Sequence, residues 1–187
     1  MDVQITRPGD SWQYDPLRYG YSSGDVLKTV SGSPSVSSNK LRLNAAEVVS
    51  MQGFRLANFS FTLNIPAVPT LADVRSWGIK TTGANSVSVA KFDIADTVFS
   101  AKVYDRVGTI IGTKTINWSS DWTATDTIFS IRISERNVFF VINETIVARF
   151  EETVEIKQTV QLTIAPLCLD VKNTNADNVD ISLLSVY

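Results

Sequence analysis

The chain has 187 residues, 44% of them hydrophobic, and a formal net charge of −2. This length and apolar content suffice for one domain with a sizeable core, and they exclude an intrinsically disordered chain. The 17 Lys and Arg residues are scattered and form no basic cluster that could bind phosphate groups. Neither nucleic acid nor a membrane is therefore expected as a partner.

The N-terminal segment breaks the pattern of the rest of the chain. Residues 1–9 form a predicted arm and residues 10–187 a single predicted domain. No apolar signal segment begins the sequence, so synthesis in the cytosol is expected. Residues typical of protein interfaces gather here, and we expect them to contact other subunits: Arg7, Trp12, Tyr14, Arg18, Tyr19 and Tyr21. The alternative is that the segment folds back as an edge strand of its own domain.

After residue 38 the dominant signal is a period-2 alternation of Val, Ile, Thr and Phe with polar residues, which is typical of strands with one buried face. In chain order it predicts strands at 40–45, 59–65, 77–80, 86–94, 99–104, 113–116, 127–133, 138–142, 145–150, 159–164, 168–173 and 180–186. The segments 45–51 and 71–76 are the best helical candidates, and each allows one or two turns.

One hairpin stands out within this series. Residues 138–142 are apolar on both faces, which predicts a central strand, and Asn143 and Glu144 form a predicted tight turn into 145–150. Alternation also predicts which side chains point inward: Phe59, Phe61, Leu63, Phe129, Ile131, Ile133, Phe140, Ile142, Leu169 and Val171.

Many short strands with short connections predict an all-β fold, a two-sheet antiparallel β-sandwich. Three stretches resemble the concanavalin A-like superfamily of legume-lectin, laminin-G-like and laminarinase-like domains: NVFFVINETIVA at 137–148, PLCLDVKN at 166–173 and DISLLSVY at 180–187. The resemblance covers most of the chain and implies a concanavalin A-like jelly roll. It reports the fold and does not by itself specify a function.

The resemblance also says which chemistry to look for. Enzymes of this fold carry a strand that reads E-x-D-x-E, so that alternation brings the carboxylates to one face. The nearest stretch here, Asp93 to Asp96, has an odd spacing that places its carboxylates on opposite faces. The chain has no His, and its one cysteine, Cys168, is expected to be buried and inert. We therefore expect no enzyme activity, no cofactor and no metal site. The segment 173–180 is rich in oxygen ligands and could hold one calcium ion, and the alternative is that it is an ordinary turn between strands.

The strongest candidate for a ligand site is the segment 117–126. Two indoles flanked by amide and carboxylate groups are what sugar binding requires, because the flat rings stack on a sugar and the polar groups bind its hydroxyls. The residues are Asn117, Trp118, Asp121, Trp122 and Asp126. The alternative is that the two indoles close the end of the sandwich as part of the core.

Together these patterns favour a non-catalytic structural or assembly protein. Cytosolic synthesis, a lectin-like sandwich and a potential docking arm suit a component of a phage-like particle: a capsid decoration, a fibre or a host-binding part. Its partners are then copies of itself or a virion shell, its location is the virion, and a cell-surface glycan is its possible ligand. The alternative is a carbohydrate-binding module that uses the Trp/Asp segment 117–126. A glycan-active enzyme with an unfamiliar site is the third hypothesis.

Overall fold

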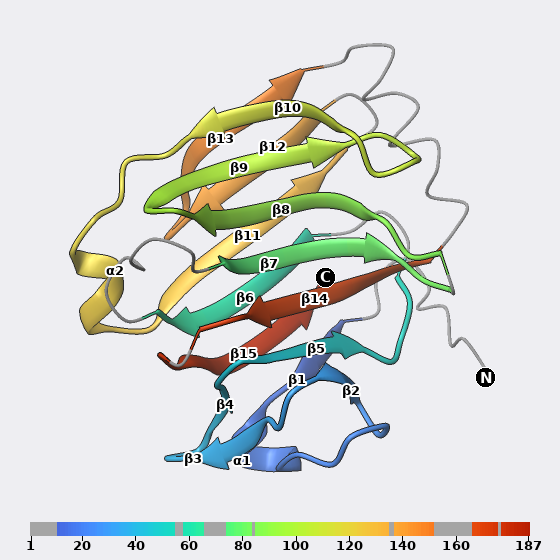
Figure 1. Ribbon diagram of the computed structural model, residues 1–187, viewed down its shortest axis with the longest axis vertical. Helices are drawn as coiled ribbons and strands as arrows, with labels where there is room; N and C mark the ends of the chain where they lie inside the picture. Colours follow the sequence, from blue (N-terminus) through green and yellow to red (C-terminus); the bar gives the residue numbers. More distant parts are fainter. Residues whose placement is uncertain are drawn as a thin grey trace.

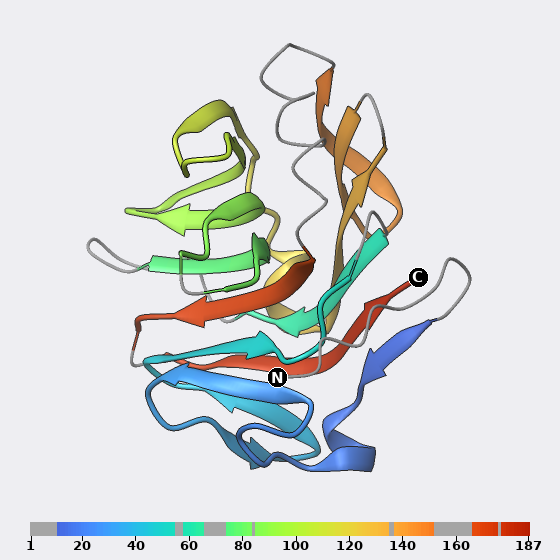
Figure 2. The ribbon, with the colours of Figure 1, turned by 90° about the vertical axis from the view of Figure 1, so that its right-hand side faces the viewer.

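The computed structural model describes residues 11–54, 58–65, 74–83, 85–134, 137–151, 166–175 and 177–187. They form two antiparallel sheets packed face to face, which confirms the predicted sandwich (Figures 1 and 2). One sheet has eight strands: β1 (Trp12–Tyr14), β3 (Ser35–Ser37), β4 (Lys40–Leu43), β6 (Asn58–Asn64), β11 (Thr127–Ile133), β12 (Asn137–Ile142), β13 (Thr145–Glu151) and β15 (Val179–Val186).

The other sheet has seven strands: β2 (Leu27–Ser31), β5 (Ala46–Ser50), β7 (Val74–Thr81), β8 (Ser88–Ala95), β9 (Val98–Tyr104), β10 (Ile110–Thr115) and β14 (Leu167–Asn173). Its spatial order is β10-β9-β8-β7-β14-β5-β2. Strand β14 therefore lies between β7 and β5, and it brings the end of the chain beside strands from its first half. The two helices within the described residues, α1 (Pro16–Tyr19) and α2 (Asp121–Ala124), have four residues each, too few to cross a membrane.

The core lies between the sheets and contains every side chain that alternation assigns to it. The predicted inward residues are all buried, from Phe59 on β6 to Val171 on β14. Aromatic rings fill the centre: Trp77 stacks on Phe92 with ring centroids 5.8 Å apart and meets Phe129 edge-on at 4.8 Å. Because these inner rings fix the pleat of β7 and β8, the alternate residues of both strands must point away from the core.

The predicted hairpin is confirmed. Strand β12 pairs with β13, and the turn residues Asn143 and Glu144 have φ angles of 45° and 67°. Positive φ at both turn positions is the geometry of a type I′ turn, whose twist matches that of the flanking strands. Asn143 also uses its side-chain oxygen to accept a hydrogen bond from the Ile128 amide, at 3.0 Å.

One helical candidate is corrected. Residues 46–50 form strand β5, which pairs with both β14 and β2, instead of a helical turn. The strand is buried on both faces, because Ala46 and Val48 join the core while Glu47 packs among lysines on the other side. In the second candidate, residues 74–76 begin strand β7, and residues 71–73 lie outside the described residues. The predicted strand 159–164 also lies outside them.

The described part of the N-terminal segment folds onto its own domain. Strand β1 pairs with β15, and Tyr14 is only 1% exposed, with its hydroxyl donating to the Gly20 carbonyl at 2.7 Å. Helix α1 begins after Asp15, whose side chain accepts from the Leu17 amide at 2.9 Å, and Pro16 occupies its first turn. The predicted arm 1–9, with Arg7, lies outside the described residues.

Candidate functional site

The outer face of the seven-stranded sheet carries two groups of charged side chains that pack against one another. This sheet lies in front in Figure 1, and it is seen from its edge in Figure 2. Strand register aligns one row of residues across it, from strand to neighbouring strand: Val49, Asp170, Gly78, Lys91, Lys102 and Thr113. Two charged clusters lie along this row, on either side of Gly78.

The first cluster contains two carboxyl groups that share one ammonium group. Lys80 Nζ lies 3.0 Å from Glu47 Oε1 and 2.9 Å from Asp170 Oδ1. Lys172 approaches the second oxygen of Glu47 at 3.4 Å. Asp170 Oδ1 is buried and has no hydrogen bond of good geometry, so its contact with Lys80 is an ion pair.

The two carboxyl groups have pKa values that move in opposite directions. Burial raises the pKa of Asp170 to about 6, although the charge of Lys80 opposes the shift. Burial also disfavours ionised Glu47, but hydrogen bonds and charge from Lys80 and Lys172 outweigh it and lower the pKa of Glu47. A neutral acid next to an ionised carboxylate is the arrangement that divides acid and base roles between two such groups.

The second cluster joins two lysines to one carboxylate. Lys91 on β8 and Lys102 on β9 are direct cross-strand partners. Asp93 bridges them: its Oδ1 lies 3.1 Å from Lys91 Nζ, and its Oδ2 accepts from Lys102 Nζ. Lys91 also lies over the Tyr104 ring, 5.5 Å from the centroid. Burial alone would lower the pKa of Lys91, but the nearby Asp93 and Tyr104 raise it above its usual value, so the lysine stays charged.

Gly78 lies between the two clusters and places no side chain on the sheet there. A Cβ atom at this position would lie 2.3 Å from the Ala90 carbonyl oxygen and 2.5 Å from Lys91 Cβ. The backbones of β7 and β8 therefore approach too closely for any side chain here. Gly78 is itself buried, and the row places a carboxyl group on one side of it and ammonium groups on the other.

The structure also identifies the residues that match the E-x-D-x-E spacing. On β8 the three positions that share the outer face are Lys91, Asp93 and Ala95, and only the middle one is a carboxylate. Asp96, which the sequence pairs with Asp93, lies in the turn after β8 with a φ of 49° and is exposed. Strand β8 therefore lacks the carboxyl pair of such a triplet.

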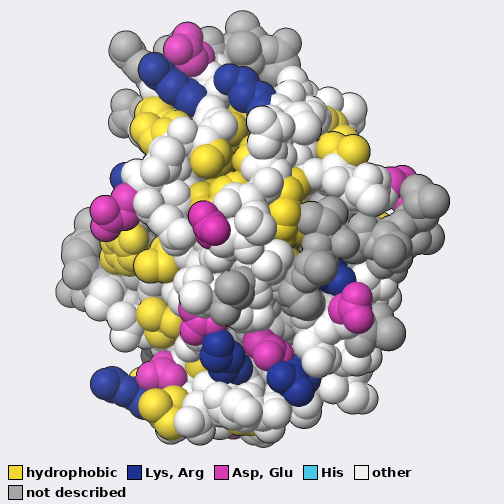
Figure 3. Space-filling view, turned by 90° about the vertical axis from the view of Figure 1, so that its left-hand side faces the viewer, with side chains coloured by type: hydrophobic (Ala, Val, Ile, Leu, Met, Phe, Trp, Pro, Cys, Tyr) yellow, Lys and Arg dark blue, Asp and Glu magenta, His cyan; other side chains and the backbone are white. Residues whose placement is uncertain are grey.

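The predicted Trp/Asp segment, 117–126, lies at the end of the sandwich and includes helix α2. Trp118 and Trp122 are half-buried and contact each other edge-on at 5.4 Å, and each packs against Phe99 of the core. Asn117 and Asp121 are exposed. Asp126 pairs with Lys40 and accepts from the Ser182 hydroxyl at 2.7 Å, so it is tied to the eight-stranded sheet. Hydrophobic side chains are visible among polar ones on this side of the molecule (Figure 3).

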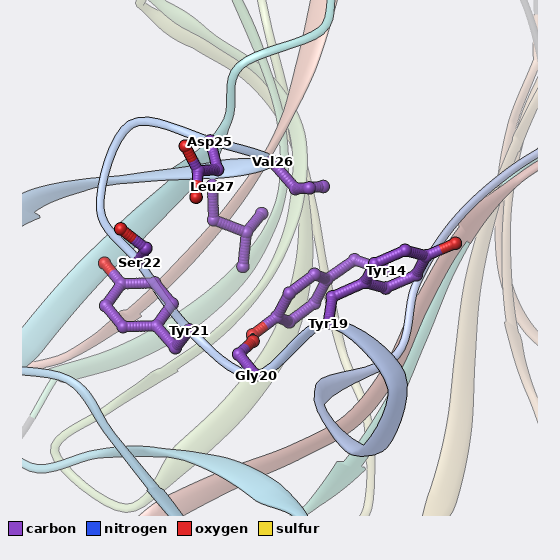
Figure 4. A pocket seen from close by; sticks show the side chains of 8 residues that line it. All are labelled: Tyr14, Tyr19, Gly20, Tyr21, Ser22, Asp25, Val26 and Leu27. Atoms are coloured by element: carbon purple, nitrogen blue, oxygen red, sulfur yellow. The ribbon is translucent and has the colours of Figure 1, made fainter.

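The predicted interface residues occupy different environments. Tyr14 belongs to the core and is unavailable to a partner, while Trp12 is half-buried against Phe54 at 5.2 Å. Tyr19 is exposed, and Arg18 is exposed beside Asp15. The three tyrosines of the segment line a cavity of about 20 Å³, with Tyr21, Ser22 and Asp25 on one side and Tyr14 and Tyr19 on the other (Figure 4). This volume holds about one water molecule.

Two further sequence candidates have structural roles. Cys168 is buried on the outer side of β14, and burial raises the pKa of its thiol to about 12, which keeps it protonated. In the 173–180 segment the buried Asn173 amide donates to the carbonyls of Leu43 and Asp177, at 2.8 and 2.6 Å. Among the described residues there is no group of three or more His, Cys, Asp or Glu side chains arranged for a metal ion.

Comparison with known proteins finds likeness in structure alone. No protein-family model and no curated protein matches the sequence. A β-glucanase of Bacillus licheniformis superposes with a TM-score of 0.68 and 13% identity, covering 96% of this chain and 99% of that chain. A laminarinase from Flavobacterium sp. UMI-01 superposes with a TM-score of 0.73 and 9% identity, covering 94% and 98%. The chain has the concanavalin A-like jelly-roll fold.

A third match carries a sugar at its active site. It is a non-specific endo-β-1,3(4)-glucanase of family GH16, crystallised with a β-linked gluco-oligosaccharide, with a TM-score of 0.70 and 9% identity over 98% of this chain and 96% of that chain. The expectation of a non-catalytic structural protein of a phage-like particle, with enzyme activity excluded, is therefore wrong: the architecture is shared from end to end with glucanases. The absence of His and of one carboxylate triplet excludes only one arrangement of acid and base groups.

Sequence reasoning missed the first cluster. Glu47 lies in a segment that the sequence assigns to a helical turn, Lys80 ends one predicted strand, and Asp170 lies in another, two residues before Lys172. Alternation alone places Asp170 opposite the core-facing Leu169 and Val171, which is a usable signal. The pairing of β14 with both β5 and β7 is what brings the three side chains together, and no local pattern encodes it.

Proposed function

We propose that this chain is a carbohydrate-active enzyme that cleaves or transfers β-linked glucan at the outer face of the seven-stranded sheet. One observation carries the proposal: Asp170 and Glu47 flank a single ammonium group, and their pKa values shift in opposite directions. The likeness of the whole chain to glucanases supports a glucan as the substrate class.

The two carboxyl groups suit a double-displacement reaction. Both oxygens contact Lys80 Nζ, so they lie within about 6 Å of each other, which is closer than the about 6.5–9.5 Å between the carboxyl groups of inverting glycosidases. Protonated Asp170 donates its proton to the leaving glycosidic oxygen while ionised Glu47 attacks the anomeric carbon. Water, or a second sugar hydroxyl, then attacks the glycosyl ester, Asp170 takes back a proton, and Glu47 leaves as a carboxylate.

Lys80 is a positioning residue in this scheme. Its ammonium group holds the two carboxyl groups on one side of the sheet, and it keeps Glu47 ionised. The charges of Asp170 and Glu47 outweigh the effect of burial and raise the pKa of Lys80 above its usual value, so it stays a cation. The scheme needs neutral Asp170 with ionised Glu47, and this combination exists in mildly acidic solution, below about pH 6.

The test is glycan cleavage by matched variants. Purified wild-type protein is incubated with β-1,3- and mixed-linkage β-1,3(4)-glucan at about pH 5, and new reducing ends and transfer products are measured. Asp170→Asn and Glu47→Gln should each lower the rate by about 10²–10⁴-fold. The controls are Asp25→Asn and Glu151→Gln, which change exposed carboxylates and should leave the rate unchanged.

The stereochemistry gives a second readout. Proton NMR of the first product should show the β-anomer, since double displacement retains configuration. Absence of cleavage and transfer with every glucan, or full activity in Asp170→Asn, would overturn the proposal. A product of inverted configuration would rule out Glu47 as the nucleophile.

A further inference from the structure

The second cluster places two like charges where a sheet normally avoids them. Lys91 and Lys102 are directly opposite across β8 and β9, a cross-strand arrangement that is destabilising for equal charges. Asp93 offsets part of the repulsion by accepting from both ammonium groups. One carboxylate does not neutralise two ammonium groups, so the cluster keeps a net positive charge.

The lysines also keep hydrogen-bonding capacity. Each ammonium group has three N–H donors; Asp93 accepts one from each, and Lys91 also donates to Tyr104, so at least one donor of each lysine is unused. The Lys91 and Lys102 side chains are 22% and 20% exposed, so both are held in place by packing and yet reach solvent. A partly buried positive centre with unused donors binds an anion more strongly than freely solvated surface lysines do.

Its position relates this centre to the proposed active site. Lys91 lies in the same cross-strand row as Asp170, with only Gly78 between them. Neighbouring strands are about 4.8 Å apart, so the centre lies about 10–15 Å from Asp170 along the row. A short glycan lying across the strands along this row would therefore reach both groups at once.

We propose that Lys91 and Lys102 form a subsite for an anionic group on the glycan, so that the substrate class is an acidic β-linked polysaccharide carrying carboxylate or sulfate groups. The inference rests on the proposed function for its placement along a glycan chain. The chemistry shared by both anions is a compact group of acceptor oxygens, which enters beside Asp93 and receives the unused N–H donors.

The test compares neutral and acidic forms of one glucan. Affinity is measured by calorimetry for a neutral β-glucan oligosaccharide and for its carboxymethylated and sulfated derivatives, at low and at high salt. Wild-type protein should bind the acidic forms at least about ten-fold more tightly than the neutral one, and the difference should shrink as salt screens the charges. Preference for only one derivative identifies the anion.

Variants assign the effect to the two lysines. Changing both to Gln leaves Asp93 without its cations, so the triple variant Lys91→Gln/Asp93→Asn/Lys102→Gln is made in parallel to keep the cluster neutral. Either variant should lose the preference for acidic glycans and keep the affinity for the neutral one. Asp93→Asn alone should tighten acidic binding several-fold, because it removes the competing carboxylate. The control Lys114→Gln, an exposed lysine of the same sheet whose ammonium group lies over the Phe150 ring, should change nothing.

The outcomes separate this inference from the proposed function. Equal wild-type affinity for neutral and acidic glycans, or an acidic preference that survives in the triple variant, overturns the anionic subsite, even if neutral glucan is cleaved. Lysine-dependent binding of acidic glycans without any cleavage supports the subsite and refutes the catalytic proposal. Absence of binding to every glycan refutes both.

Discussion

The buried carboxyl group of Asp170 predicts an unusual pH dependence of stability. Its pKa is raised by burial to about 6, so the folded chain binds this proton more tightly than the unfolded chain does. The stabilisation is complete below the ordinary pKa of the group and is lost as the pH rises through about 6. The free energy of unfolding should fall by about 2 kcal/mol between about pH 4.5 and 8 because of this one group.

Neighbouring groups of the cluster do not cancel this trend. The lowered pKa of Glu47 contributes stability that is lost only as the pH falls below its ordinary value, outside the window. Lys80 stays charged throughout it, because its pKa is raised. Asp170 is therefore the group of this cluster that titrates between about pH 4.5 and 8.

The variant Asp170→Asn isolates the effect, because asparagine has a similar shape and cannot ionise. Urea unfolding of wild type and variant is followed by tryptophan fluorescence across this pH range. The stability of the variant relative to wild type should rise by about 2 kcal/mol from the acidic to the alkaline end, which is about 4–8 °C in melting temperature for a chain of this size. Asp25→Asn should track wild type. Parallel pH profiles of Asp170→Asn and wild type would refute a buried, proton-binding Asp170.

Two further predictions concern packing around the site and at the sheet end. Gly78→Ala should lower the free energy of unfolding by about 1–3 kcal/mol and reduce glycan cleavage, because its Cβ would lie 2.3 Å from the Ala90 oxygen; a change below about 0.5 kcal/mol in urea unfolding would contradict the close approach. Trp122→Ala should cost about 2 kcal/mol, since the half-buried indole packs 5.7 Å from the Phe99 ring. If the indole also stacks on sugar, Trp122→Phe should retain stability while glycan affinity falls; unchanged affinity assigns Trp122 to packing alone.

The fold was predictable from the sequence because its signals are local. Alternation in β6 and β11 identifies the inward side chains, and Asn143 marks a turn with positive φ angles at both positions. Strand β5 defeats the same reasoning, since Glu47 interrupts an apolar run at a position that is buried by lysines from other strands. Whether a charged residue is buried beside an opposite charge depends on residues that are distant in the sequence, and a short stretch of sequence does not reveal them.

The candidate site was harder to predict because it depends on how many opposite charges contact each group, and residue types alone do not show this. Around Lys80 two carboxyl groups share one ammonium group; Glu47 has a second cation in Lys172, and Asp170, whose pKa is raised, is the one that holds a proton. Around Asp93 the ratio is reversed, since two ammonium groups share one carboxylate. The carboxyl group with the smaller share of cationic charge keeps its proton more readily, whereas an excess of ammonium groups favours anion binding. Because one cross-strand row joins the two clusters through Gly78, a single glycan lying across the strands meets both, and this placement assigns chemistry to one end of the row and recognition to the other.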